Sequence, residues 1–327
     1  MTREQVDPLA GYFQLMTWNG ISRLYRTACE SGILDAVAEG PGSAAVIAER
    51  CGTLPGPTSL VLEALCEAGV VRRDEESYGP GPVMAMLQGN YHDLGDSYWD
   101  HLTNFLQTGE PVIRLQNPHE AQAFYRKQAG ELGAMMRPSA ALVTRELSIG
   151  AERKGLSILD VGAGSGVWSL TMAAVDPSSR VTCLDWPAVL PVAEQFAEQA
   201  GVWERLELLP GDYHEIDLGE SQYDLVILGN TTHLEDPDGN RSLFRRAHRA
   251  LQSGGGILVI DVFSHNRAAA LTGALYALGL ALRTTLGAVY SAQEMTRLLA
   301  ESGFAEPRFV PIRVPPGVMG MIHALKR

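Results

Sequence analysis

Three glycines and an acid near the middle of the chain have the types and spacing of a ligand-binding turn. An apolar strand predicted at residues 158–161 includes Asp160, and Gly162, Gly164 and Gly166 follow at alternate positions. Because glycine has no Cβ, a ligand can lie directly against the backbone of such a turn. A dinucleotide fold uses the wider spacing G-x-G-x-x-G to seat a pyrophosphate. This turn therefore suits a different ligand, or it has a purely structural role.

Two further acids lie at the ends of predicted strands. The strand from Arg180 to Asp185 ends 19 residues after Gly166, and in a doubly wound fold an acid there accepts hydrogen bonds from both ribose hydroxyls. A lone Asp after a strand more often caps a helix, but the distance from the glycine turn favours the ribose role. The next strand ends at Asp212 and Tyr213, which can hold an adenine amino group and stack on its ring. An ordinary Gly-Asp turn is the alternative.

The elements that must position these residues alternate between strand and helix. Further strands are predicted at residues 223–230 and 256–263, with a helix at about 240–252 between them. Such alternation predicts a parallel sheet, with ligands at the carboxyl ends of its strands. His233 and Asp261 lie at or just beyond such ends. The predicted fold class is therefore α/β, with a cofactor site along one edge of the sheet.

With these motifs, the chain resembles the two-domain S-adenosylmethionine-dependent small-molecule O-methyltransferases: plant phenolic, acetylserotonin, and bacterial polyketide and carotenoid enzymes. The discriminating element is Asp-x-Pro-x-Val at residues 185–189, because many unrelated methyltransferases share only the glycine turn. The resemblance covers nearly the whole chain and is strongest between about residues 156 and 265. It implies a Rossmann-like doubly wound domain that binds S-adenosylmethionine and releases S-adenosylhomocysteine. The cofactor-binding residues it implies are Asp160, Gly162, Gly164, Gly166, Asp185, Trp186, Gly211, Asp212, Tyr213 and Asn230.

His233 stands where the family's catalytic histidine stands. A phenol with a pKa near 10 is mostly neutral at pH 7, and histidine, with an ordinary pKa near 6.5, is the natural base to remove its proton. The resemblance implies that Asp261 orients the histidine. Tyr290 stands where a second acid is usual, and it can hydrogen-bond the substrate or His233, or simply pack. A histidine that only fixes its loop is the alternative to the base.

Three departures from the family pattern surround the histidine. Leu234 and Glu235 follow it, where an acid and an aromatic residue are usual, and Gly229 stands where lysine is common. Some relatives with altered residues methylate carbon or nitrogen, for example on a keto acid or heterocycle, and a few have lost methyl transfer. These remain the alternatives to transfer onto a hydroxyl. His233 and His265 suggest a metal site, but no spacing shows that they converge, and we expect no metal.

Residues 1–140 are predicted to form a separate helical domain with a connector. A helix at residues 21–38, helices capped by Ser43 and Thr58, and a hairpin near Tyr78 are the elements of a winged-helix unit. Residues 20–90 contain five Arg or Lys against nine Asp or Glu, so this surface would repel a phosphate backbone and nucleic-acid binding is not expected. In the family this module forms a homodimer. The first helix offers Tyr12, Phe13, Met16 and Trp18 as contacts between subunits, or as packing on its own core.

The acceptor is expected to be hydrophobic or aromatic. The apolar segment 268–286, which follows the fifth strand, is a candidate cap over the substrate. In the family a long helix, here at residues 120–146, joins the domains and lines the pocket. Methionines and aromatics at helical spacing also pack in cores, so a core role is the alternative. The candidate substrate-binding residues are Trp99, Phe105, Phe124, Met135 and Met136.

Composition limits the remaining possibilities. A length of 327 residues suggests two domains, predicted as residues 1–140 and the catalytic residues 141–327. The four cysteines have neither disulfide nor zinc spacing, the N-terminus has no secretory signal, and the longest apolar stretch is too short to span a bilayer. We therefore expect a cytoplasmic enzyme that does not bind membranes.

Overall fold

The computed structural model describes residues 7–87, 96–112, 118–264, 270–315 and 317–326. Two compact units divide the chain, Met1–Leu94 and Gly95–Arg327. The helix predicted as a connector belongs to the second unit. The assignment of residues 1–140 to dimerisation and of residues 141–327 to catalysis stays a prediction.

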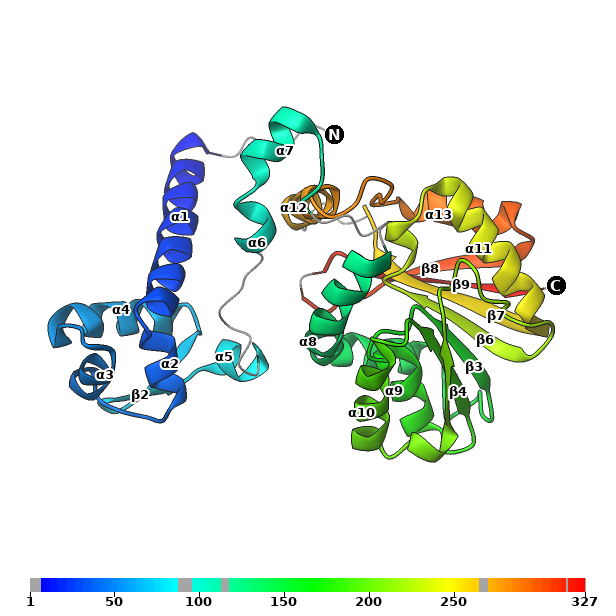
Figure 1. Cartoon of the computed structure of the whole chain (residues 1–327), viewed down its shortest axis with the longest axis horizontal. Helices are drawn as coiled ribbons and strands as arrows, with labels where there is room; N and C mark the ends of the chain where they lie inside the picture. Colours follow the sequence, from blue (N-terminus) through cyan, green and yellow to red (C-terminus); the bar gives the residue numbers. More distant parts are fainter. Residues whose placement is uncertain (1–6, 88–95, 113–117, 265–269, 316, 327) are drawn as a thin grey trace. The chain divides into compact units, whose positions relative to one another are not determined.

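The first unit consists of helices followed by a hairpin, as the sequence predicts for a winged-helix unit (Figure 1). Its core includes Tyr25 of the first helix, Leu34, Leu62 and Tyr78. The two strands of the hairpin pair antiparallel. The elements are α1 (Pro8–Glu30), α2 (Ile33–Ala38), α3 (Ala44–Cys51), α4 (Pro55–Glu67), β1 (Val71–Asp74), β2 (Ser77–Pro80) and α5 (Pro82–Leu87).

Two predicted helix boundaries in this unit were wrong. The helix expected at residues 21–38 is broken, because Gly32 adopts a left-handed conformation (φ 73°) between α1 and α2. Helix α4 begins at Pro55 rather than after Thr58, since proline is well suited to a first helical position. Thr58 lies inside the helix, where its hydroxyl is 2.7 Å from that of Thr53. Ser43 caps α3 as predicted, accepting from the Val46 amide.

A seven-stranded sheet forms the centre of the second unit, in the order β5-β4-β3-β6-β7-β9-β8. Strands β3 to β7 pair parallel, whereas β9 pairs antiparallel with both β7 and β8. The order reverses direction between β3 and β6, which creates a crevice at the carboxyl ends of the strands. The strands are β3 (Ser157–Val161), β4 (Arg180–Asp185), β5 (Leu206–Pro210), β6 (Tyr223–Gly229), β7 (Leu251–Val262), β8 (Phe304–Pro311) and β9 (Met319–Lys326).

Helices cover both faces of this sheet because successive strand residues point to opposite faces. Ile158 packs on one face with α8, α9 and α10, and Leu159 packs on the other with α11 and α13. Figure 1 shows these two helical layers. The α-helices of this unit are α6 (Asp96–Trp99), α7 (Leu102–Thr108), α8 (Pro118–Glu146), α9 (Val167–Val175), α10 (Leu190–Ala200), α11 (Pro237–Ala250), α12 (Ala270–Ala281) and α13 (Ala292–Glu301), with short 3₁₀ turns η1 (Trp203–Arg205) and η2 (Thr232–Leu234).

Asp176 organises the turn between α9 and β4. Its carboxylate accepts hydrogen bonds from the hydroxyls of Ser178 and Ser179 at 2.6 Å each, and from the backbone of Gly155 at 2.7 Å. Burial by itself would raise the pKa of Asp176, but these donors outweigh it and hold the pKa well below its ordinary value. Asp176 is therefore ionised, and its carboxylate holds the turn together.

Candidate active site

A cavity of about 350 Å³ lies where the strand order reverses. Most of the residues that sequence reasoning assigned to the cofactor converge on it, from the ends of β3, β4, β5 and β6. It is lined by Gly162, Gly164, Asp185, Trp186, Gly211, Asp212, Tyr213 and Asn230, and also by Tyr125, His214, Thr231, Leu234, Glu235, Thr284 and Leu286.

The glycine turn has a backbone that other residues rarely adopt. Gly162, Gly164 and Gly166 all have φ between 57° and 67°, in the left-handed region. Gly162 and Gly164 line the cavity, where the missing side chains leave the backbone open to a ligand. Gly166 does not line it, and a Cβ there would lie 2.8 Å from the Leu170 side chain. The first two glycines therefore leave open backbone on the cavity wall, and the third serves packing.

Asp160 lies behind the turn rather than on the cavity. Its Oδ2 accepts the Ser169 hydroxyl at 2.6 Å, and its buried Oδ1 has no hydrogen-bond partner among the described residues. Burial raises the pKa of Asp160 to about 7, although Ser169 opposes this shift. Asp160 therefore joins β3 to the start of α9 rather than lining the cavity.

Asp185 presents its carboxylate to the cavity from the end of β4. The backbone N–H groups of Gly164 and Trp186 each donate to it at 2.7 Å. Burial nevertheless raises the pKa of Asp185 to about 6, with these two donors opposing the shift. Because no cationic side chain pairs with it among the described residues, the carboxylate can accept further donors such as hydroxyl groups.

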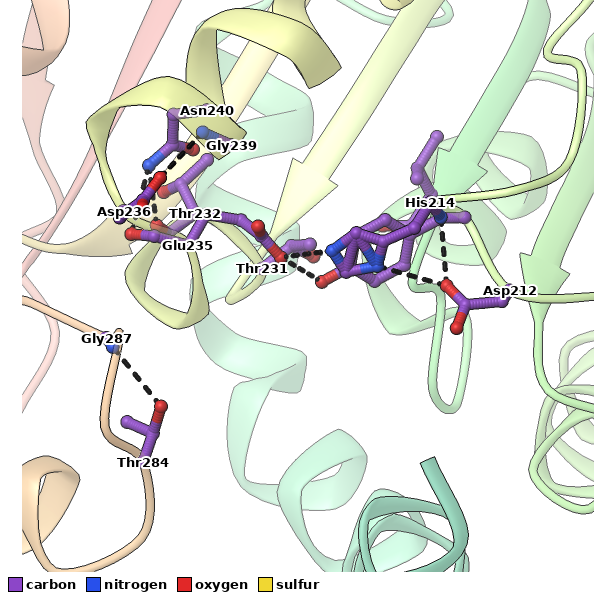
Figure 2. A network of polar contacts seen from close by, with 12 residues as sticks. Asp212, His214, Thr231, Thr232, Glu235, Asp236, Gly239, Asn240, Thr284 and Gly287 are labelled. Atoms are coloured by element: carbon purple, nitrogen blue, oxygen red, sulfur yellow. Dashed lines mark hydrogen bonds and ion pairs between the residues drawn. The ribbon is translucent and has the colours of Figure 1, made fainter. Parts of the chain in front are cut away.

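Asp212, Tyr213, His214 and Glu235 all line the cavity and form a polar cluster. Figure 2 shows Asp212, His214 and Glu235 of this cluster. The His214 ring stacks on Tyr213 with centroids 4.3 Å apart, and its nitrogens lie 3.1 Å from Asp212 Oδ1 and 2.9 Å from Glu235 Oε1. The Tyr213 hydroxyl donates to the same Glu235 oxygen at 2.7 Å. Sequence reasoning identified Asp212 and Tyr213 but missed His214. Glu235 was noticed only as a departure from a pattern.

His233 and Asp261 form a buried pair at the ends of β6 and β7. His233 Nδ1 lies 2.7 Å from Asp261 Oδ1, and the His233 backbone N–H donates to Oδ2 at 3.0 Å. The Thr232 hydroxyl and the Val262 N–H also donate to this carboxylate, at 2.6 and 2.8 Å. Four donors fix the carboxylate, which holds Nδ1 and leaves Nε2 to other partners. Thr231, Leu234 and Glu235 line the cavity, whereas Thr232, His233 and Asp261 do not.

Two tyrosines lie near this pair in different roles. The Tyr290 hydroxyl donates to the Glu235 carbonyl at 2.7 Å, and Tyr290 does not line the cavity. Tyr276 of α12 places its hydroxyl 3.5 Å from both nitrogens of His233, with the rings edge to face. Burial raises the pKa of Tyr276 well above its ordinary value, so its hydroxyl is neutral. Sequence reasoning missed Tyr276, although the apolar segment 268–286 that contains it was singled out.

The candidate acceptor residues are dispersed over several helices, and none lines the cavity. Trp99 is half-buried beside Gly279 of α12, and Phe105 is half-buried on α7. Phe124 packs edge to face on Tyr125, and Tyr125 is the one that lines the cavity. Met136 packs against the sheet core, whereas Met135 is exposed.

Gly229, where the resemblance implies lysine, faces the indole of Trp168. A Cβ at this position would lie 2.3 Å from Trp168 Cδ1 and 2.5 Å from its Nε1. Trp168 is 3% exposed and belongs to the core of the α9 face. The indole therefore occupies the space that a longer residue at position 229 would need.

Within the described ranges, no three or more His, Cys, Asp or Glu side chains are grouped so that they could hold a metal ion. His265 lies outside these ranges. The helices of the described part of the chain include none that is both long and apolar enough to cross a membrane.

The family model for the O-methyltransferase domain matches residues 117–305, more than half of the chain and the part that contains the cavity. The chain belongs to this family. It is thus an S-adenosylmethionine-dependent small-molecule methyltransferase, as the sequence motifs predicted.

Relatives of this methyltransferase act on different atoms, according to their names. It is 26% identical to the tetracenomycin polyketide synthesis 8-O-methyl transferase TcmO of Streptomyces glaucescens, over 90% of this chain and 91% of that one. It is 24% identical to the N,N-dimethyltransferase OxyT of Streptomyces rimosus, over 93% and 94%. It is 29% identical to an L-tyrosine C(3)-methyltransferase of Streptomyces lavendulae, over 61% and 53%.

Among solved structures, human N-acetylserotonin methyltransferase in complex with S-adenosylmethionine is similar over 100% of this chain and 99% of that one. The TM-score is 0.74 and the sequence identity 19%. This likeness confirms the predicted fold, a helical N-terminal region followed by an α/β methyltransferase sheet.

Proposed function

We propose that this methyltransferase transfers a methyl group to a hydroxyl of a hydrophobic, aromatic small molecule, with His233 as the general base. The observation that carries the proposal is the buried His233–Asp261 pair. It lies at the carboxyl ends of the strands, and residues on both sides of His233 line the cavity. The polyketide and acetylserotonin O-methyltransferases among its relatives support the same acceptor class.

The cavity fits S-adenosylmethionine. The open backbone of Gly162 and Gly164 can receive its amino-acid end, the Asp185 carboxylate its ribose hydroxyls, and Asp212 its adenine amino group. When bound, this cofactor supplies a methyl group already activated by its positive sulfur. The protein has only to align the acceptor and remove its proton, and alignment alone is worth on the order of 7–11 kcal/mol in favourable cases.

Asp261 determines what His233 can do in this step. Its carboxylate accepts from Nδ1, which leaves Nε2 unprotonated in the neutral ring and able to take the acceptor's proton. The resulting imidazolium is stabilised by the same carboxylate. Tyr276 places a neutral, partly apolar side chain against His233, which suits an aromatic acceptor.

The proposal is tested with isotopically labelled S-adenosylmethionine and a panel of phenols and keto acids. We expect the label in an ether-linked methyl group. We expect His233→Gln to lower kcat by about 10²- to 10⁴-fold, the usual contribution of general base catalysis, and to leave the Kd for S-adenosylhomocysteine unchanged. His248→Gln is the matched control, since His248 lies on α11 against Phe304, and it should retain full turnover. Unchanged turnover in His233→Gln would refute the base assignment.

Transfer to carbon is the second candidate, favoured by the tyrosine C-methyltransferase among the relatives and by the departures at Leu234 and Glu235. It would use the same base. Label found on carbon or nitrogen, with no ether product from any phenol of the panel, would overturn transfer to a hydroxyl.

We also propose that the enzyme is a homodimer that uses helix α1. Tyr12, Phe13, Met16 and Trp18 are all exposed on this helix within the first unit, and contiguous exposed apolar surface is typical of interaction sites. Light scattering should give about twice the mass of one chain. A monomer at micromolar concentration would contradict the proposal.

A further inference from the structure

Glu235 is a buried acid that the proposed function leaves without a role. It lies two residues after His233, where the family pattern has an aromatic residue, and only 8% of it is exposed. Glu235 lines the cavity, whereas Asp261 does not. A buried carboxylate is costly unless it is hydrogen-bonded or paired with a cation, so its partners indicate what it does.

Asp212, Tyr213 and His214 form the part of the cavity wall expected to hold adenosine, which we call the adenosine wall. The side chain of Glu235 contacts this wall. Its Oε1 accepts the Tyr213 hydroxyl at 2.7 Å and lies 2.9 Å from His214 Nε2. His214 Nδ1 faces Asp212 Oδ1 at 3.1 Å (Figure 2). His214 thus lies between the two acids, with one ring nitrogen facing each carboxylate. Glu235 is thereby linked to Asp212 and Tyr213, the residues expected to hold adenine.

The main chain of Glu235 belongs to the segment that carries His233. Its carbonyl accepts the Tyr290 hydroxyl at 2.7 Å and the Asn240 side-chain amide at 3.4 Å. The same amide donates to the Thr232 carbonyl at 2.9 Å. Asn240 therefore holds the main chain at Thr232 and at Glu235, the two ends of the short segment that contains His233.

Helix α11 holds the adenosine wall as well. Arg246 of this helix donates to the carbonyls of Tyr213, His214 and Ile216. Both the wall and the His233 segment are thus tied to α11 by their main chains. The contacts of Tyr213 and His214 with the Glu235 carboxylate join the two segments directly through side chains.

We propose that Glu235 is a positioning residue that couples the adenosine wall to the placement of His233. The proposal rests on the proposed function, because it takes His233 as the base. A displacement of Tyr213 or His214 is transmitted through the Glu235 carboxylate to the main chain next to the base. Loss of the carboxylate should therefore affect cofactor binding and the methyl-transfer step together.

The test compares Glu235→Ala, Glu235→Gln and the matched control Glu215→Ala, an exposed acid of the same wall loop. We expect Glu235→Ala to weaken S-adenosylhomocysteine binding, measured by calorimetry, by about tenfold and to lower kcat at saturating S-adenosylmethionine by about tenfold. Effects of this size are usual when a hydrogen bond to a charged group is lost. Glu215→Ala should change neither.

Glu235→Gln keeps an oxygen that can accept from Tyr213, so it should recover kcat to within about threefold of the wild type, as expected for a neutral hydrogen bond in place of a charged one. A residue that only maintains the fold would not show this rescue. If Glu235→Ala does not fold, Tyr213→Phe replaces it. We expect this variant to weaken S-adenosylhomocysteine binding and to lower kcat by about threefold each. A wild-type kcat in Glu235→Ala, or in Tyr213→Phe where it stands in, would overturn the coupling, as would a Gln variant as impaired as Ala.

Failure of this inference is distinguishable from failure of the proposed function. Calorimetry with S-adenosylhomocysteine needs neither an acceptor nor a base, so the binding arm does not depend on the role of His233. Full turnover in His233→Gln would refute the assignment of His233 as the base, but it would not affect the binding measurement on the Glu235 variants. If kcat is lowered in His233→Gln but is that of the wild type in Glu235→Ala, the proposed role of Glu235 is overturned and the proposed function is not.

Discussion

Protonation of Asp185 is expected to weaken cofactor binding below about pH 6. Burial raises the pKa of this carboxyl to about 6 in the free protein, despite the two backbone donors at 2.7 Å. Ribose hydroxyls that donate to the carboxylate favour its ionised form, so binding below this pKa must release a proton. The apparent Kd for S-adenosylhomocysteine should therefore double at about pH 6 and rise about tenfold by pH 5, which is about 1.4 kcal/mol for one pH unit.

The assay is calorimetry between pH 5 and 8 in two buffers with different protonation enthalpies, which counts the released protons directly. Asp185→Asn is the control, because it removes the ionisable group at this position and leaves every other group of the cavity in place. This variant should bind more weakly at pH 7 and should lose the part of the pH dependence that Asp185 causes. A wild-type Kd that is constant from pH 5 to 8, or a variant with the wild-type pH profile, would refute the ribose role.

Two further predictions concern stability. Gly229→Ala should lower the free energy of unfolding by about 1–3 kcal/mol in urea titrations, because its Cβ would overlap the Trp168 indole. Gly273→Ala is the control, since there is open space around Gly273, and it should not lower the free energy of unfolding. Equal effects of the two substitutions would contradict this reason. Asp176 has a folded-state pKa below its ordinary value, so its stabilising contribution is present above about pH 4 and is lost as the pH falls further. Asp176→Asn should therefore lower Tm at pH 7, and the difference from wild type should narrow below pH 4; a difference that is independent of pH would contradict the assignment.

The sheet and its glycine turn were predictable because their signals are local. Buried parallel strands are continuous apolar runs, and β3, β4 and β6 lie within a residue or two of the predicted ranges. Acids at strand ends must meet at one edge of a parallel sheet, which is why Asp185 and Asp212 were both assigned to the same site. The observed cavity brings these two residues together.

The connections between segments were not predictable from one sequence. His214 and Glu235 are carried by the ends of β5 and β6, which two other strands separate in the sheet, so their contact depends on the path of each loop. The same holds for Tyr276, since a helical apolar segment does not reveal which of its residues faces His233. The break at Gly32 was missed because apolar spacing continues across it, while the chain direction changes.

The contact between Trp168 and Gly229 constrains how this chain can change over generations. A single substitution that introduces lysine at position 229 would place its first carbon inside the indole, so the variant would carry the packing cost predicted for Gly229→Ala before its new charge was of use. A smaller residue has to replace Trp168 first, and that step by itself leaves a hole in a tightly packed core. The two positions therefore have to change in a fixed order, or nearly together, and lineages that carry the tryptophan should retain the glycine.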